Sequence, residues 1–304
     1  MYNYPKNVLN SAQLLQKWVD KDMKIKPSDN AENALQNIGY YRLKGYCFHL
    51  FDRNTGKFEK DTDFSNIIDL YNFDTELSHL VFGYISEIEV TLRARTVNAL
   101  LIYNDALILN DPSVFDNKAL YWKNQSTVAT EIARSDDVFI KHNFRNHDGA
   151  IPLWAVVEVM SFGTLSKIIK TMKTGTHSAF SVLTDMYKFD GTKGRKIKPS
   201  KKLFTSWIQS VCIMRNICAH NSRIYNRALS TTPELINSDK ITPVPKFSGL
   251  YQILLSMKYL RPSDKSWIDF TEKLNALFNK YSHVIEYKRL NFPSDWETHI
   301  KIEE

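Results

Sequence analysis

The segment Arg215-Asn-Ile-Cys-Ala-His220 combines a guanidinium, a carboxamide and an imidazole, with no acidic side chain. Histidine can transfer a proton near neutral pH. Arginine can stabilise the negative charge that builds on phosphorus during a phosphoryl reaction. These residue types therefore suit chemistry on a phosphodiester, and Arg215, Asn216 and His220 are the candidate catalytic residues.

The spacing of these residues predicts where they point if the segment is helical. Asn216 and His220 are four residues apart and share one face, and Arg223 and Arg227 extend the same stripe. Arg215 precedes His220 by five residues, which places the two about 140° apart around an ideal helix. They converge poorly unless the helix bends or ends there, or unless the same helix of a partner subunit completes the site. The alternative is a chance spacing on a solvated helix face.

A strongly basic stretch precedes the motif. Between Lys188 and Lys202 the chain has seven Lys or Arg residues and one Asp. Gly191, Gly194 and Pro199 predict a mobile loop, and such a loop would attract a polyanion by counterion release. The alternative is a solvated surface loop that keeps the protein soluble. The candidate RNA-binding residues of this stretch are Lys193, Arg195, Lys196, Lys198, Lys201 and Lys202.

Two carboxylates outside the motif are candidates for supporting it. Glu89 and Arg93 are four residues apart on a predicted helix and can pair. They form either an ordinary surface pair or a partly buried pair that orients Arg215 or His220. Glu158 lies in an apolar run, where a carboxylate must face water or find a partner such as an arginine of the motif helix.

A second arginine and histidine pair lies in the aromatic-rich segment Tyr40–Phe51. His49 follows Arg42 by seven residues, so the spacing is formally similar to that of the motif. Its neighbours are large apolar side chains, and we therefore interpret the pair as structural.

Composition limits the classes of protein to which the chain can belong. It has 304 residues, 43% of them hydrophobic, a net charge of +7 and a pI near 9.1, with only 10 Gly and 10 Pro. These values favour a globular fold of long regular elements. No apolar run approaches the roughly 18 residues that span a bilayer, so we expect no membrane segment. Cys47, Cys212 and Cys218 lack metal-ligand spacing and are interpreted as buried thiols of a cytoplasmic protein. We expect no metal and no cofactor, because the sequence contains no Gly-rich phosphate loop and no zinc-type spacing.

Apolar residues recur at helical spacing over most of the chain, which predicts an all-α fold. Residues 104–150 are weakly patterned and are expected to hold short helices and a loop. The principal predicted helices run from Asp63 to about Tyr103, from Pro152 to Gly163 and from Lys201 to Arg227. The predicted organisation is an N-terminal helical and aromatic segment (residues 1–60), a helical core with the motif (61–232) and a C-terminal helical segment (233–304).

The motif and its flanks, Arg215-Asn-Ile-Cys-Ala-His-Asn-Ser-Arg-Ile-Tyr-Asn-Arg227, resemble the signature of bacterial abortive-infection proteins of the AbiD/AbiF type, the Abi-2 family. Further segments resemble the same family in the same order, so that the likeness extends over nearly the whole chain. These segments are Ile38–Tyr46, Tyr71–Leu77, Ile88–Arg93, Pro152–Ser166 and Phe292–Trp296.

The resemblance carries implications for fold and activity. The Abi-2 family is similar to the HEPN superfamily, helical bundles with an Arg-X4–6-His motif, many of which are metal-independent ribonucleases active as dimers. It implies a HEPN-like bundle with N- and C-terminal helical extensions and a role in phage defence by growth arrest. It also implies that Arg215 and His220 form the catalytic pair, followed by the polar Asn216, and that Arg223 and Arg227 bind RNA or support the site. Some relatives are encoded beside a small structured RNA, which would be a second RNA partner. The resemblance implies no catalytic role for Arg42 and His49, because the family's pattern has no fixed histidine at that segment.

The sequence therefore leads to the expectation of a dimeric, metal-independent endoribonuclease. Two other classes remain open. One is a non-catalytic RNA-binding protein whose arginines and histidine only hold phosphates. The other is a helical defence scaffold that acts through a small structured RNA or a protein partner.

Overall fold

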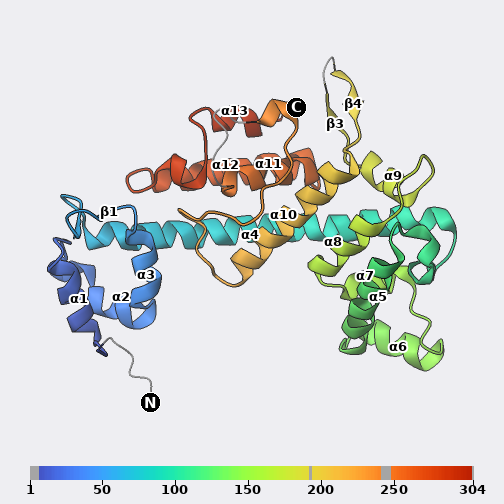
Figure 1. The fold of residues 1–304 in the computed structure, drawn as a ribbon, viewed down its shortest axis with the longest axis horizontal. Coiled ribbons are helices and arrows are strands. Elements are labelled where there is room, and N and C mark those ends of the chain that lie inside the picture. The colour runs from blue at the N-terminus through green and yellow to red at the C-terminus, as the bar shows by residue number, and fades with distance from the viewer. Residues whose placement is uncertain (1–6, 192–193, 241–247, 303–304) are drawn as a thin grey trace.

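A computed structural model describes residues 7–191, 194–240 and 248–302, and Figure 1 shows that these residues are helical almost throughout. This confirms the predicted all-α class. Two short antiparallel hairpins pair β1 (Phe51–Asp52) with β2 (Lys57–Phe58) and β3 (Phe189–Asp190) with β4 (Lys196–Ile197). The helices are α1 (Ser11–Val19), α2 (Ala31–Asn37), α3 (Tyr40–Cys47), α4 (Phe64–Leu100), α5 (Lys118–Ala133), α6 (Val138–Asn146), α7 (Leu153–Val159), α8 (Phe162–Thr171), α9 (Ala179–Asp185), α10 (Lys201–Ala219), α11 (Leu250–Leu260), α12 (Asp264–Lys280) and α13 (Trp296–Ile300).

The central element is α4, whose 37 residues extend over roughly 55 Å. Its apolar residues recur at helical spacing, and one face of them, including Phe64, Ile67, Phe73, Leu77, Val81, Ile85, Ile88 and Leu92, is completely buried. Helices α3, α9, α10 and α12 pack along it. The helix predicted from Asp63 to about Tyr103 is confirmed, with Leu101–Tyr103 forming a final 3₁₀ turn.

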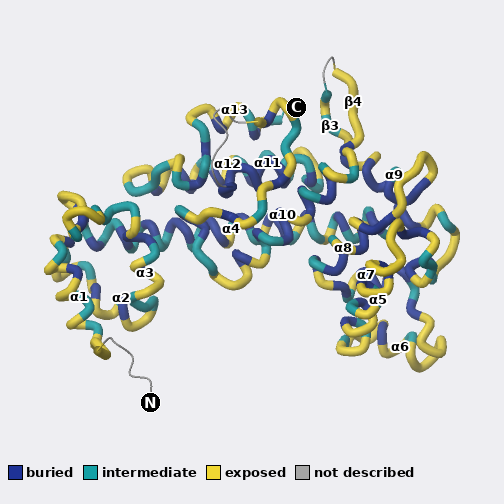
Figure 2. The backbone as a smooth tube through the Cα atoms, viewed as in Figure 1, coloured by how far each residue is buried: buried dark blue, intermediate teal, exposed yellow. Residues whose placement is uncertain are grey.

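The helix that carries the motif, α10, crosses α4 and also packs against α8 and α11. Figure 2 shows that the buried residues concentrate where these helices meet. A single core cluster extends from Trp18 to Ile300, so residues of all three predicted segments share it. The division into residues 1–60, 61–232 and 233–304 stays a prediction.

The remaining helices lie around α4 at three places in Figure 1. The short helices α1 to α3 lie at one end of α4, and α5 to α7 lie towards the other end on the same side. Helices α11 to α13 lie on the opposite side. The C-terminal end of α10, where the motif lies, points into the region between the first two groups.

Three local predictions were wrong. The motif helix ends at Ala219 rather than Arg227, because Asn221 adopts a left-handed conformation with φ of 48°. The helix predicted from Pro152 to Gly163 is divided into α7 and α8, since the Ser161 hydroxyl caps a new helix. The stretch predicted as a mobile loop before α10 contains the β3–β4 hairpin.

Two further properties concern the described residues only. None of their helices has both the length and the apolarity needed to cross a bilayer. They contain no group of three or more His, Cys, Asp or Glu side chains placed to hold a metal ion.

Candidate functional site

Arg215 is held from α4 by a carboxylate that it shares with a second arginine. Glu89 Oε2 lies 3.7 Å from Arg215 Nε, and Glu89 Oε1 accepts a hydrogen bond of 2.5 Å from Arg93 Nη2. The Glu89 and Arg93 side chains are only 13% and 11% exposed, whereas Arg215 is 38% exposed. Solvent screens such a pair less than a surface pair. The arrangement corresponds to the partly buried alternative, with Arg215 rather than His220 as the oriented residue.

The guanidinium of Arg215 faces a pocket of about 320 Å³ between α4, α5, α10 and the turn from α7 to α8. Arg93, Arg134 and Arg215 line it, and Glu89 is the only carboxylate among its lining residues. Ser161 and Gly163 add the N-terminal end of α8, where the Ser161 N–H already donates to the Glu131 carboxylate at 3.2 Å. Three arginines and one carboxylate among the lining residues suit a phosphate group.

Arg134 is a pocket residue that the sequence analysis missed. It follows the last residue of α5, its side chain is 70% exposed, and its Nη2 lies 3.8 Å from Glu131. Residues 104–150 show weak helical periodicity, and no local motif marks an arginine there. Only the packing of α5 against α7 and α8 brings it to the pocket.

His220 lies at the end of α10, outside the residues that line the pocket. Its N–H donates to the Asn216 carbonyl at 3.1 Å, as in the helix before it. Its exposed imidazole has no hydrogen bond, ion pair or ring contact with the residues that the structure describes. Asn216 is also exposed and accepts a long 3.5 Å contact from Arg215 Nη1. Arg215 therefore lines the pocket while His220 does not.

The arginines after the motif helix do not continue its stripe, because the chain turns away and docks on α3 and α4. Asp74 of α4, which is 3% exposed, accepts hydrogen bonds from the Tyr46 hydroxyl at 2.8 Å and from the N–H of Tyr225 at 2.6 Å. It also accepts one from the N–H of Ile224 at 3.1 Å. Burial raises the pKa of Asp74, and these hydrogen bonds oppose that rise.

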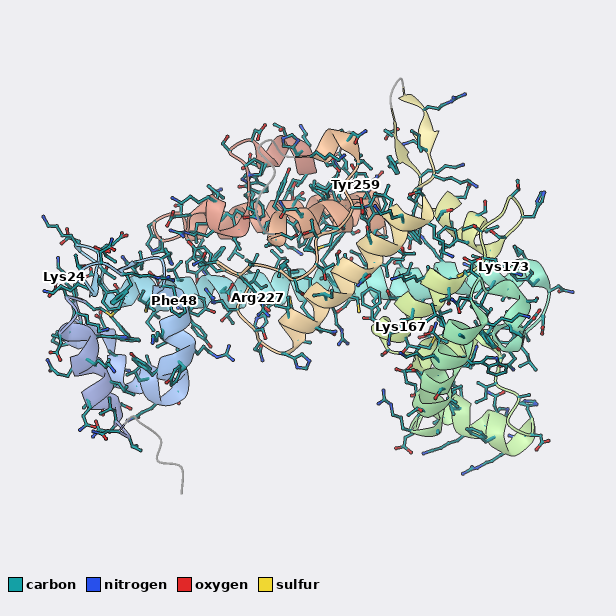
Figure 3. All side chains as sticks on the ribbon, in the orientation of Figure 1. Lys24, Phe48, Lys167, Lys173, Arg227 and Tyr259 are labelled. Atoms are coloured by element: carbon teal, nitrogen blue, oxygen red, sulfur yellow. The ribbon has the colours of Figure 1, made fainter. Side chains whose placement is uncertain are left out.

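Arg223 is part of this docked segment. Its Nη1 donates to the Tyr225 carbonyl at 3.0 Å, and its guanidinium lies 5.9 Å from the centre of the Tyr46 ring. Arg227 is exposed and donates to the Arg223 carbonyl at 3.3 Å; Figure 3 places it beside the lower end of α10. Arg223 thus has a structural contact, while Arg227 is available to a ligand.

Comparison with known proteins gives one match. The family model of Abi-like proteins (Abi_2) matches residues 33–226, which is more than half of the chain. The chain belongs to the family of Abi-like proteins. It is therefore an abortive-infection-type protein, as the resemblance predicted. No curated protein and no solved structure matches it.

The matched range contains most of the segments on which the resemblance rests. Three of them contain residues that make the contacts described above. Ile38–Tyr46 and Tyr71–Leu77 contain the residues that receive the docked segment, including Tyr46 and Asp74. Ile88–Arg93 contains the Glu89 and Arg93 pair. Asp74 was also missed in the sequence, although a carboxylate within an apolar helical pattern is a sign of a buried partner. Phe292–Trp296 lies outside the matched range.

Arg42 and His49 also contact the segment that follows α10, beside Tyr46 and Asp74. We call this region of α3 and α4 the docking surface. Arg42 Nη1 donates to the Asn221 carbonyl at 2.6 Å. The His49 ring contacts Tyr225 edge to face at 5.6 Å, and its buried Nδ1 has no hydrogen-bond partner among the described atoms. Burial, with a smaller effect of Arg289, lowers the pKa of His49 to about 4. These contacts agree with the structural interpretation of the pair.

The basic stretch does not adjoin the motif, contrary to the sequence-based expectation. The β3–β4 hairpin lies at the N-terminal end of α10, and the part of that helix that precedes Arg215 separates it from the motif by roughly 21 Å (Figure 1). Arg195 is exposed, and Lys193 lies outside the described residues. The lysines of this stretch that form ion pairs are Lys188 and Lys198 with Asp185, Lys196 with Asp190, Lys201 with Asp116 and Lys202 with Glu234.

Glu158 has an exposed side chain, which was the first of the two alternatives. Arg93 reaches its backbone carbonyl at 3.4 Å rather than its carboxylate. Arg93 also donates to the Val157 carbonyl, so it fixes the end of α7 to α4. The proposed roles of all these residues in RNA binding or catalysis stay predictions.

Proposed function

We propose that this Abi-like protein is a metal-independent endoribonuclease of the HEPN type, acting in the cytoplasm during abortive infection. The observation that carries the proposal is the Glu89 bridge. A partly buried carboxylate fixes Arg93 and leaves the Arg215 guanidinium directed at a small, arginine-rich pocket. A purely solvated arginine needs no such support, whereas a group that must stabilise a charged transition state does.

The proposed reaction is the attack of a ribose 2′-hydroxyl on the adjacent phosphorus. His220 accepts the proton of the 2′-hydroxyl as the new P–O bond forms. Arg215, with Arg134 beside it, stabilises the pentacoordinate phosphorane. The bond to the 5′-oxygen then breaks, and a second imidazole donates the proton that this oxygen takes up. The products are a 2′,3′-cyclic phosphate and a 5′-hydroxyl. Each proton transfer contributes roughly 10²–10⁴ to the rate, and no step requires a metal.

We propose that the second imidazole is His220 of the partner subunit in a homodimer. Arg215 and His220 point to different surroundings within one subunit, so a single chain offers an anion pocket and a separate exposed imidazole. Two chains related by a twofold axis would bring both imidazoles to one phosphodiester. RNA is then the substrate, and a small structured RNA is a further proposed partner.

The test compares wild type with His220→Ala and Arg215→Ala on total RNA, with and without excess EDTA. The exposed His220 side chain has no hydrogen bond, ion pair or ring contact with the described residues, so His220→Ala should leave the melting temperature unchanged and abolish cleavage. EDTA should leave the wild-type rate unchanged, and the new ends should be 5′-hydroxyls. Full cleavage by folded His220→Ala would refute the enzyme proposal.

A non-catalytic RNA-binding protein is the second candidate, and one observation favours it. General bases are usually oriented by a further hydrogen bond, and His220 has no such contact within the described part of the chain. If the arginines only hold phosphates, wild type will bind RNA with a steep salt dependence and yield no cleavage products at any protein concentration.

A further inference from the structure

A second and larger pocket lies at the N-terminal end of the molecule, far along the chain from the motif. It has a volume of about 870 Å³ and is enclosed by α1, α3 and the β1–β2 hairpin. That size is within the range of small-molecule sites. None of the candidate catalytic or RNA-binding residues lines it.

The floor and one wall of this pocket are aromatic. Trp18 is 2% exposed and stacks on Tyr40, with ring centres 4.9 Å apart. Tyr41 and Phe48 also line the pocket, yet they are 76% and 54% exposed. Figure 3 places Phe48 where α3 meets α4. Two large rings with this much exposed surface beside a buried aromatic floor offer faces on which a planar ligand can stack.

The rim of the same pocket is cationic. Lys17, Lys21, Lys44 and Arg53 line it, and no Asp or Glu residue does. Lys21 lies 4.8 Å from the centre of the Phe51 ring. None of the four has an ion pair with the residues that the structure describes. Nearby lysines are paired, namely Lys24 with Asp61, Lys26 with Asp63 and Lys57 with Asp22.

The exposed rings and the cationic rim together limit the chemical class of ligand that fits this pocket. An inorganic anion uses the cations but leaves the exposed rings uncovered. A neutral apolar molecule covers the rings but leaves four unpaired cations around it. A nucleotide satisfies both, because its base has a π-face that stacks on aromatic side chains and its phosphate pairs with lysine and arginine.

We propose that this N-terminal pocket binds a nucleotide unit. The base stacks on Tyr41 and Phe48, and Lys17, Lys44 and Arg53 bind the phosphate. A free nucleotide and one residue of a single-stranded RNA share this chemistry. The proposal does not depend on catalysis at the motif.

The test is titration of the whole protein with two probes, adenosine 5′-monophosphate and a 2′-O-methyl hexanucleotide that cannot be cleaved by 2′-hydroxyl attack. The double variant Tyr41→Ala/Phe48→Ala removes the stacking surface, and Lys17→Glu/Lys44→Glu reverses the rim charge. Trp122→Ala, which removes a 64% exposed ring of α5, is the matched control. The four changed residues of the pocket variants have exposed side chains, so the melting temperature should stay near that of wild type.

Both pocket variants should weaken nucleotide binding at least about fivefold, since a stacked base contributes about 1–3 kcal/mol, and Trp122→Ala should not. Equal affinity for the two probes would identify a free nucleotide as the occupant. Tighter binding of the hexanucleotide, lost in the pocket variants, would identify a strand. If wild type binds neither probe at millimolar concentration, or if Trp122→Ala weakens binding as much as the pocket variants, the proposal is overturned.

Discussion

Glu89 connects the core of the molecule to the exposed arginine of the motif. It is one of few carboxylates with little exposure in α4, and it contacts Arg93 and Arg215 through different oxygens. Two guanidiniums around one carboxylate leave the group net positive. Arg93 is nearly buried and anchored to α7, so it is fixed. Arg215 is the partner that remains open to a ligand.

Replacing Glu89 with Gln should therefore affect Arg215 more than the fold. The amide can still accept the hydrogen bond from Arg93, but it loses the charge that holds Arg215. A loss of about 1–2 kcal/mol in positioning corresponds to a rate about tenfold lower. RNA cleavage kinetics should show a lower kcat with little change in KM. Exposed Glu87→Gln, two residues earlier on the same helix, should change neither. Equal kcat values for Glu89→Gln and Glu87→Gln would show that Glu89 does not position Arg215.

His49 gives the docking surface a predictable response to acid. Its pKa falls from the ordinary 6.5 to about 4 because burial, and then Arg289, disfavour the imidazolium. The unfolded chain thus binds the proton first as the pH falls. The contribution of His49 to the free energy of unfolding is complete above pH 6.5, and it is lost progressively as the pH falls towards 4.

Urea denaturation of wild type and His49→Phe should show this difference. Phenylalanine keeps an aromatic ring against Tyr225 but cannot titrate. The variant should lose less stability than wild type between pH 6.5 and 4. His177→Gln, at an exposed position, should follow wild type. If the free energy of unfolding falls equally with pH in wild type and His49→Phe, the loss of stability does not come from His49.

At the scale of elements, the sequence predicts well the features that depend only on the residues of one helix. The boundaries of α4 follow from its apolar period, and its predicted start and end differ from the structure by only a few residues. The end of α10 does not follow, because a residue distant in sequence determines it. Asp74 captures the N–H groups of Ile224 and Tyr225, which a continued helix would use internally. The pocket at Arg215 likewise depends on α5 and the α7–α8 turn, whose arrangement no local pattern encodes.

This tertiary contact makes Asp74 a large single contributor to stability. Asp74→Ala leaves the Tyr46 hydroxyl and two backbone N–H groups without an acceptor in the core. The expected cost is about 3 kcal/mol or more of the free energy of unfolding. Asp74→Asn keeps one acceptor oxygen and should cost less. Chemical denaturation measures both, with the exposed Asp269→Ala as the control. If Asp74→Ala is as stable as that control, the docked segment is held by other contacts.

At the scale of the whole molecule, the two ends of α10 differ in how their charge is used. Beside the hairpin, lysines are neutralised by Asp185, Asp116 and Glu234. At the motif end, Arg215 and Arg134 exceed the carboxylates of their pocket, and Arg227 and His220 are exposed. The proposed function therefore predicts that RNA binds at the motif end, in the region between the N-terminal helices and α5 to α7.

That end offers a charged pocket and an imidazole outside it, and the proposed dimer would complete the site with a second chain. The decisive measurement mixes two inactive proteins, His220→Ala and Arg215→Ala, after dissociation and reassociation. Each mixed dimer retains one His220 and one Arg215. If the site is shared across the interface, the mixture should recover a low activity that neither parent shows, roughly 10²–10⁴ below that of wild type because only one of the two imidazoles is present. The double variant His220→Ala/Arg215→Ala, mixed with either parent, is the control and should stay inactive. A wild-type enzyme that is fully active as a monomer would place the whole reaction within one subunit.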